Sequence, residues 1–266
     1  MLKNSTIKKF TENKIKFAII TGGSGRIGSV FTQILINSGT KVLCLSRDEK
    51  KFKNFKKKLG KQKKLVSWAY LDLADKNSIE NIVASIKKKY KKIDLLVNNA
   101  FFSNRGENFN YQSFSLNKEL FGSIGGTILF TECLIKILRN TKNSKVINIG
   151  SIWGTLAPKQ SIYGKLQIGP SAISGVGKSG IINYTKFLAA REAKFNITVN
   201  SLSPGWFPRK GKVENPKYIK QITHNVPLNR IGKLEDLISP VIFLLSDGSN
   251  YYTGQNLVID GGYSIW

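Results

Sequence analysis

The chain has 266 residues, of which 41% are hydrophobic, enough for one large domain or two small ones with an ordinary core, and this excludes a disordered or fibrous protein. Its apolar runs, such as residues 17–20 and 241–245, stop well short of the roughly 20 residues that a membrane-spanning helix needs, so we expect no membrane protein. The net charge of +26 would suit nucleic acid, but 35 of the 42 basic residues are lysine and only 7 are arginine, which makes nucleic acid the least favoured partner.

The predicted elements begin after a basic N-terminal arm, residues 1–14. From Ile15 onward, short β-branched runs alternate with longer amphipathic ones, and no change in composition marks a second domain. The predicted strands are 16–21, 41–46, 65–72, 93–98, 145–150, 197–203 and 256–259. The predicted helices are 27–38, 51–59, 78–90, 120–138, 178–195 and 234–245. This alternation predicts one α/β domain over residues 15–266, a parallel sheet with helices on both faces.

Few residues of this chain could hold a metal or form a disulfide. Cys44 and Cys133 are isolated in apolar segments, which argues against both kinds of site and fits a reducing, cytoplasmic location. The single histidine, His224, falls in a predicted loop, so histidine-dependent catalysis would depend on that residue alone.

A glycine-rich turn follows the first predicted strand and opens the first predicted helix, in the segment 17–28. Glycine is needed where the chain turns sharply and where bare backbone must approach a pyrophosphate at a helix N-terminus. The turn therefore predicts a dinucleotide site, with a glycine turn that binds nothing as the alternative.

Four later segments, taken in order with this turn, resemble the short-chain dehydrogenase/reductase family over the rest of the chain. They are Asn98-Asn99-Ala100, Ile147 to Ser151, Pro204-Gly205, and Thr253 to Gly262. The resemblance implies a single Rossmann-type, doubly wound domain with a nicotinamide dinucleotide lying across the carboxyl ends of the strands. The cofactor-binding residues that it implies are Gly22, Ser24, Gly25, Arg26, Ile27, Gly28, Ser46, Arg47, Asp72, Leu73, Asn98, Ala100, Lys178, Pro204 and Gly205.

The glycine spacing departs from that of most short family members. Gly22, Gly25 and Gly28 are spaced as in the extended branch of the family, although the chain is too short for the large substrate domain of that branch. Either spacing leaves bare backbone at the phosphates, so we expect cofactor binding to survive.

The choice between NADP(H) and NAD(H) depends on the end of the second predicted strand. An acidic residue there would accept from a ribose 2′-hydroxyl, but the chain has Ser46 and Arg47, which suit a 2′-phosphate. We therefore favour NADP(H), with NAD(H) possible. Asp72 matches the family residue at the adenine, or else it caps the next helix.

The resemblance also implies a catalytic serine, tyrosine and lysine, with an asparagine on the helix after the fourth strand. Ser151 and Lys178 match the serine and the lysine. The tyrosine position, four residues before the lysine, holds Ser174, and the asparagine position holds Ser123. An insert after Ser151 carries Tyr163, which could replace the phenol or merely pack the insert.

Two functional hypotheses remain open. The first is an NADP(H)-dependent oxidoreductase acting on a carbonyl or alcohol, such as a sugar derivative, whose proton donor could be Tyr163, Ser151 or a water held by Lys178. The second is a dinucleotide-binding protein without turnover, acting as a sensor, partner subunit or scaffold. We also expect a substrate-covering loop over residues 206–232, and a homo-oligomer formed through helices 120–138 and 178–195.

Overall fold

A computed structural model describes residues 14–101, 116–162, 171–207 and 216–265. Over these residues seven parallel strands form one sheet in the order β3-β2-β1-β4-β5-β6-β7. The strands are β1 (Phe17–Thr21), β2 (Lys41–Ser46), β3 (Val66–Tyr70), β4 (Leu95–Asn98), β5 (Lys145–Ile149), β6 (Thr198–Pro204) and β7 (Asn256–Ile259). This confirms the predicted doubly wound Rossmann-type sheet, and each predicted strand is present within a few residues of its expected bounds.

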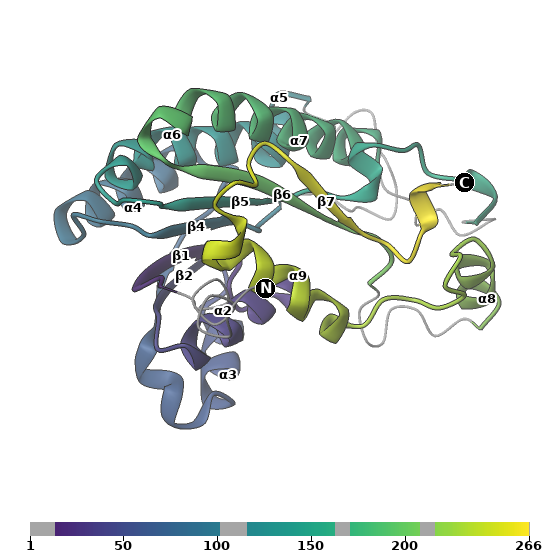
Figure 1. Cartoon of the computed structure of the whole chain (residues 1–266), viewed down its shortest axis with the longest axis horizontal. Helices are drawn as coiled ribbons and strands as arrows, with labels where there is room; N and C mark the ends of the chain where they lie inside the picture. The colour runs from purple at the N-terminus through teal and green to yellow at the C-terminus, as the bar shows by residue number, and fades with distance from the viewer. Residues whose placement is uncertain (1–13, 102–115, 163–170, 208–215, 266) are drawn as a thin grey trace, which may run out of the picture.

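Alternating side chains of each strand supply two separate cores. Ile19, Leu43 and Val146 face one core, whereas Ala18 and Val42 face the other. Helices cover both faces of the sheet, with α4, α6 and α7 on one side and α2, α3 and α9 on the other (Figure 1). Burial on both faces explains why these strands read as nearly continuous apolar runs.

The helices are α2 (Arg26–Asn37), α3 (Glu49–Lys57), α4 (Lys76–Lys89), α5 (Leu116–Leu120), α6 (Gly126–Arg139), α7 (Ala172–Glu192), α8 (Pro216–His224) and α9 (Ile238–Leu245). Three helices, predicted from residues 51, 78 and 178, begin earlier, at Glu49, Lys76 and Ala172, because the side chains of Asp48, Asp75 and Ser171 cap them by accepting a backbone N–H.

Two predictions about helices need correction. The expected helix 120–138 begins at Leu116 and contains a π-helical turn, η2 (Phe121–Gly125), between α5 and α6. The expected loop 206–232 contains α8, and His224 is the last residue of that helix rather than a loop residue. The short, polar α8 has too few apolar residues to stand out in the sequence, although proline at its first position is a usual start signal.

Leu116–Arg139 is long and apolar enough to cross a membrane by length and composition, a stretch that the sequence analysis overlooked. Half of its most apolar window is buried inside the structure. A core helix of a folded domain passes the same test, and α6 supplies Phe130 and Leu134 to the core beneath α4 and α7.

Candidate cofactor and catalytic site

The order of the strands reverses between β1 and β4, and the loops after these two strands are tied together there. The Thr21 hydroxyl oxygen accepts from the backbone N–H groups of Asn99 and Ala100, both at 3.0 Å. The Asn99 side-chain amide donates back to the carbonyls of Thr21 (2.9 Å) and Gly22 (3.1 Å). Open α/β sheets bind ligands at such a reversal, so these hydrogen bonds join the two loops where the sequence predicts the dinucleotide.

The glycine turn fits the phosphates of a dinucleotide because its backbone has no room for side chains. A Cβ on Gly28 would lie 2.3 Å from the Gly22 carbonyl oxygen, and one on Gly25 would lie 2.9 Å from the same atom. Gly22 adopts φ +67°, in the left-handed region. The turn ends at Gly25, the N-cap of α2, so Arg26, Ile27 and Gly28 form the first turn of that helix, and Ser24 is buried just before it.

Ser46, Arg47 and Asp72 meet at the carboxyl ends of β2 and β3. The indole N–H of Trp68 donates to the Ser46 hydroxyl oxygen at 2.9 Å. The Arg47 guanidinium lies 3.6 Å from the Asp72 carboxylate and remains more than half exposed. The helix-cap alternative for Asp72 is wrong, because Asp75 caps α4 whereas Asp72 accepts from the N–H of Ala74. The structure therefore brings together the three side chains predicted to surround the adenosine end of the cofactor.

Asn98 differs from its expected role, since its side chain points into the protein. Its amide donates to the Thr131 hydroxyl and the Asn148 side-chain oxygen, and Asn148 in turn donates to Thr185. This buried chain of hydrogen bonds joins β4, β5, α6 and α7. The residue that faces the glycine turn is its neighbour Asn99, which the sequence analysis quoted but assigned no role.

Leu73 lies after β3, where helix α6 approaches closely. A Cβ on Gly126 would fall within covalent range of the Leu73 carbonyl oxygen, so only glycine fits at this crossing. The crossing fixes the loop that carries Asp72 and Leu73 against the start of α6.

Lys178 brings an amine to the same edge of the sheet, at the end of β5. Its Nζ donates to the Ile149 carbonyl oxygen at 2.5 Å and lies 4.4 Å from the centre of the Phe101 ring. Burial lowers the pKa of Lys178 from 10.5 to about 7. Both protonation states are therefore accessible near neutral pH. The contact with Phe101 carries no sequence signal, because Phe101 simply follows the Asn98-Asn99-Ala100 segment.

The three serines of the expected catalytic set lie on three different segments, one of them the helix that carries Lys178. Ser174 is one helical turn before Lys178 in α7, near the helix start that Ser171 caps. Ser151 follows β5 and accepts from the N–H of Trp153 at 3.2 Å. Ser123 lies in the π-helical turn and packs against Gly177, whose Cβ would fall 2.9 Å from the Ser123 side chain.

The Ser123 hydroxyl donates to the Leu120 carbonyl oxygen at 3.2 Å, so its proton is used within its own helix. Tyr163, the candidate substitute phenol, lies outside the described residues. Among the described residues, the site therefore combines one amine and two serine hydroxyls at the carboxyl edge of the sheet.

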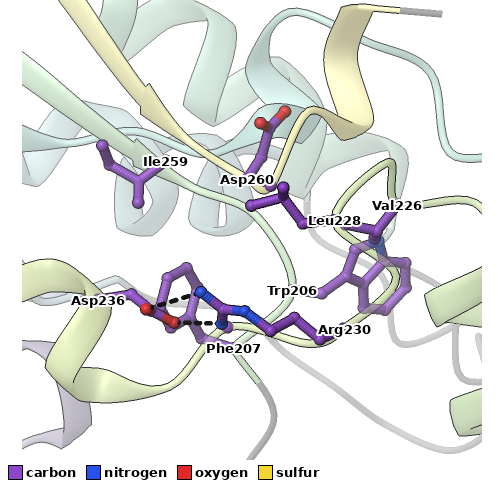
Figure 2. A pocket seen from close by; sticks show the side chains of 10 residues that line it. Trp206, Phe207, Val226, Leu228, Arg230, Asp236, Ile259 and Asp260 are labelled. Atoms are coloured by element: carbon purple, nitrogen blue, oxygen red, sulfur yellow. Dashed lines mark hydrogen bonds and ion pairs between the residues drawn. The ribbon is translucent and has the colours of Figure 1, made fainter.

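The carboxyl ends of β6 and β7 form the wall beside this site. Pro204 ends β6, and the Gly205 N–H donates to the Ile259 carbonyl at 2.8 Å. Beyond Gly205, a cavity of about 210 Å³ is lined by Trp206, Phe207, Val226, Leu228, Arg230, Gly232, Asp236, Ile259, Asp260 and Gly261 (Figure 2). Most of this lining belongs to the predicted substrate segment 206–232.

Two of the three charged side chains that line this cavity, Arg230 and Asp236, are paired with each other, and the third, Asp260, accepts from the backbone N–H groups of Gly262 and Ser264. Arg230 donates to both carboxylate oxygens of Asp236, at 2.7 and 2.9 Å, as the dashed lines in Figure 2 mark. This pairing lowers the pKa of Asp236 to about 2. Trp206 also joins Trp153 and Tyr263 in edge-to-face contacts with ring centres 5.6–6.3 Å apart. The wall thus combines aromatic and aliphatic side chains, and the charges of Arg230 and Asp236 neutralise each other.

Known proteins share both the sequence pattern and the fold. The family model described as Enoyl-(Acyl carrier protein) reductase matches residues 24–264. A 7alpha-hydroxysteroid dehydrogenase of Bacteroides fragilis is 27% identical over 96% of this chain and 95% of that protein. A D-arabinitol 2-dehydrogenase [ribulose-forming] of Scheffersomyces stipitis is 27% identical over 94% of each chain.

A solved structure agrees over the whole chain. The short chain dehydrogenase of Leptospira borgpetersenii with bound NAD+ has a TM-score of 0.80 and 29% identity, covering 100% of this chain and 97% of that one. The family match spans most of the chain, and the glycine turn lies at the strand reversal. The chain belongs to the short-chain dehydrogenase/reductase family of oxidoreductases.

Proposed function

We propose that this protein is an NADP(H)-dependent oxidoreductase that interconverts a carbonyl and an alcohol on a small molecule, with a sugar-like polyol or ketose as the favoured class. The observation that carries the proposal is the glycine turn tied to Asn99, with the Lys178 amine at the same sheet edge. The relatives named above oxidise or reduce a steroid and a polyol, which supports the reaction type and leaves both substrate classes to be tested. When bound, the nicotinamide would supply or accept the hydride.

The preference for NADP(H) is argued from Ser46 and Arg47. Trp68 donates to the Ser46 oxygen, so the Ser46 hydroxyl keeps its own proton to donate to a 2′-phosphate. Arg47 is more than half exposed and can reach the same phosphate, although Asp72 at 3.6 Å weakens the positive field.

This preference is tested by titrating NADPH and NADH against wild type and Arg47→Ala. A charge-assisted hydrogen bond is worth about 1.5–3 kcal/mol, so we expect NADPH affinity to fall roughly tenfold to a hundredfold and NADH affinity to change little. Equal affinities for both cofactors in the wild type would contradict the preference.

Turnover is the point at which the two hypotheses differ. A serine hydroxyl at position 174 cannot span the place of a phenol ring, and it is a weak acid without a dedicated base. The alternative function, a dinucleotide-binding sensor, subunit or scaffold, is favoured by this residue and by the Ser123 hydroxyl, which is bonded within its helix. The oxidoreductase is favoured by the amine at the site, which remains able to exchange a proton.

The deciding experiment follows NADPH absorbance with D-ribulose, a keto acid and a steroid 7-ketone as probes, after cofactor binding has been established by a shift in melting temperature. Turnover supports the oxidoreductase, and binding without turnover supports the alternative. Ser174→Tyr should raise a low wild-type rate if the site accommodates the ring, because general acid catalysis is worth about a hundredfold to ten-thousandfold.

The remaining expectations are part of the same proposal. The exposed Val176 and Phe187 on α7 and the exposed Ile265 near the C-terminus are apolar surface that a second copy of the chain would cover, which supports a homo-oligomer. The two unpaired cysteines suit a cytoplasmic location. We also assign the wall from Trp206 to Gly232 to the substrate.

A further inference from the structure

The amine of Lys178 has unusual surroundings for a group that only holds a cofactor. The amine donates to the Ile149 carbonyl at the end of β5 and lies over the face of the Phe101 ring after β4. We propose that Lys178 itself transfers the proton to and from the substrate oxygen, the role for which the family's pattern leads one to expect a phenol. This inference rests on the proposed oxidoreductase function.

Geometry places the amine where the proton is needed. β4 and β5 are neighbours in the sheet, and β4 borders the strand reversal at which the glycine turn lies. The Ser174 position is one helical turn before Lys178 on the same helix, so a phenol there would project beside the lysine head. With serine at that position, no ring from residue 174 stands between the amine and the space that a substrate would enter.

The surroundings also set the acidity of the amine. The described groups against the amine, the Ile149 carbonyl and the Phe101 ring, carry no charge. Burial alone accounts for its lowered pKa, about 7. A general acid works best when its pKa lies near the working pH, and this amine meets that condition without a second group to tune it.

The step balances in both directions. In reduction the carbonyl carbon gains a hydride from the reduced nicotinamide, the C=O π bond becomes a C–H and an O–H bond, and the new O–H proton leaves Lys178 Nζ. The neutral amine then takes a proton from water, so the net consumption is one NADPH and one proton. In oxidation the neutral amine takes the hydroxyl proton while the hydride leaves the carbon.

Ser151 is a weaker candidate for this transfer. Its hydroxyl oxygen already accepts from the Trp153 N–H, and no titratable side chain among its described hydrogen-bond partners could act as its base. It remains able to donate a hydrogen bond to the substrate oxygen and so to position it for Lys178.

The first part of the test is spectroscopic and needs no turnover. Protein labelled with ¹³C at lysine Cε is titrated with and without NADP+, and the Lys178 resonance is assigned by its loss in Lys178→Arg. We expect the Lys178 resonance to titrate several pH units below those of the exposed lysines. If the Lys178 resonance titrates near 10.5 in both states, the proposal is overturned.

The second part is kinetic, with D-ribulose and D-arabinitol as the first probes. As pH increases, the rate of reduction should fall and the rate of oxidation should rise. Both changes should share one midpoint, which coincides with the Lys178 pKa measured in the cofactor complex. Lys178→Arg keeps a cation but cannot release its proton near neutral pH, so we expect a loss of about a hundredfold to ten-thousandfold in turnover with NADPH affinity of the wild-type order.

Controls separate this role from a structural one. Lys186→Arg, on the exposed side of the same helix, should keep the wild-type profile, and Lys178→Met provides a second variant that has no proton to transfer. Retained turnover in Lys178→Arg, or loss of the pH midpoint in Tyr163→Phe, would overturn the proposal and leave the oxidoreductase intact. Absence of any NADPH-linked turnover in the wild type would overturn the proposed function, and this inference with it.

Discussion

Gly28→Ala should damage the cofactor site more than any other single methyl added to the glycine turn. The new Cβ would lie 2.3 Å from the Gly22 carbonyl oxygen and 2.8 Å from the Asn99 amide nitrogen, and at least the first contact is with backbone that cannot rotate away. Overpacking of this kind costs about 1–3 kcal/mol. If Asn99 is also displaced, its two hydrogen bonds to Thr21 and Gly22 are lost, at about 0.5–1.5 kcal/mol each.

The combined cost is about 2–6 kcal/mol, which at roughly 2–4 °C per kcal/mol lowers the melting temperature by at least several degrees. Because the turn supplies the phosphate-binding backbone, we also expect NADPH to bind at least about tenfold more weakly, measured by fluorescence titration. Gly60→Ala is the matched control, since Gly60 has φ +55° and no atom near its missing Cβ, so only a strain of roughly 1–2 kcal/mol is expected. Wild-type NADPH affinity in Gly28→Ala would refute the assignment of the turn to the phosphates.

Three further predictions concern stability and assembly. Burial lowers the pKa of Lys145 to about 8, so the unfolded chain binds this proton more tightly than the folded chain does. The free energy of unfolding should therefore rise as pH increases from about 8 toward 10.5. Lys145→Met should flatten this part of a profile of melting temperature against pH. Arg139 donates two hydrogen bonds to the fully buried Glu192 carboxylate, so Arg139→Ala should cost about 1.5–3 kcal/mol in urea unfolding, whereas Arg230→Ala, which removes an exposed pair, should have a smaller effect. Light scattering at micromolar concentration should give a multiple of 29.7 kDa, and a mass equal to the single chain would disprove the proposed oligomer.

The sheet could be predicted because burial on both faces leaves a strong local signal. Runs such as Phe17–Thr21 and Lys41–Ser46 are apolar and β-branched, are bounded by turn residues, and are separated by helices of ordinary length. The start of α3 was missed because one capping side chain, Asp48, outweighs the apolar periodicity of the first turn. Helix α8 was missed for a related reason, since its stability depends on Ile222 packing against residues distant in sequence.

The residues of the candidate site also differ in how far the sequence could predict them. The glycine turn acts through its backbone, and backbone requirements are visible in a sequence as glycine at fixed spacing. Which of two adjacent asparagines faces the turn depends on the strand end: the pleat directs Asn98 toward Thr131 and Asn148, and this leaves Asn99 to bind Gly22. The ring of Phe101 over Lys178 depends on a loop path that no local pattern encodes.

Lys145 and Lys178 show why the surroundings of an amine matter more than its burial in assigning a role. Lys145 is the first residue of β5, and the amine of Lys178 lies at the other end of the same strand, where it donates to Ile149. Burial lowers the pKa of both amines. Lys145 Nζ donates to the side chains of Ser249 and Asn250, which ties the loop after α9 to the sheet and uses the amine structurally. Within the described parts of the chain, Lys178 has one backbone acceptor and an aromatic face instead. An ammonium group has three protons to donate, and the Ile149 carbonyl accepts one of them. The others can be donated to a ligand at the sheet edge where the glycine turn lies, and this distinguishes a catalytic amine from a structural one.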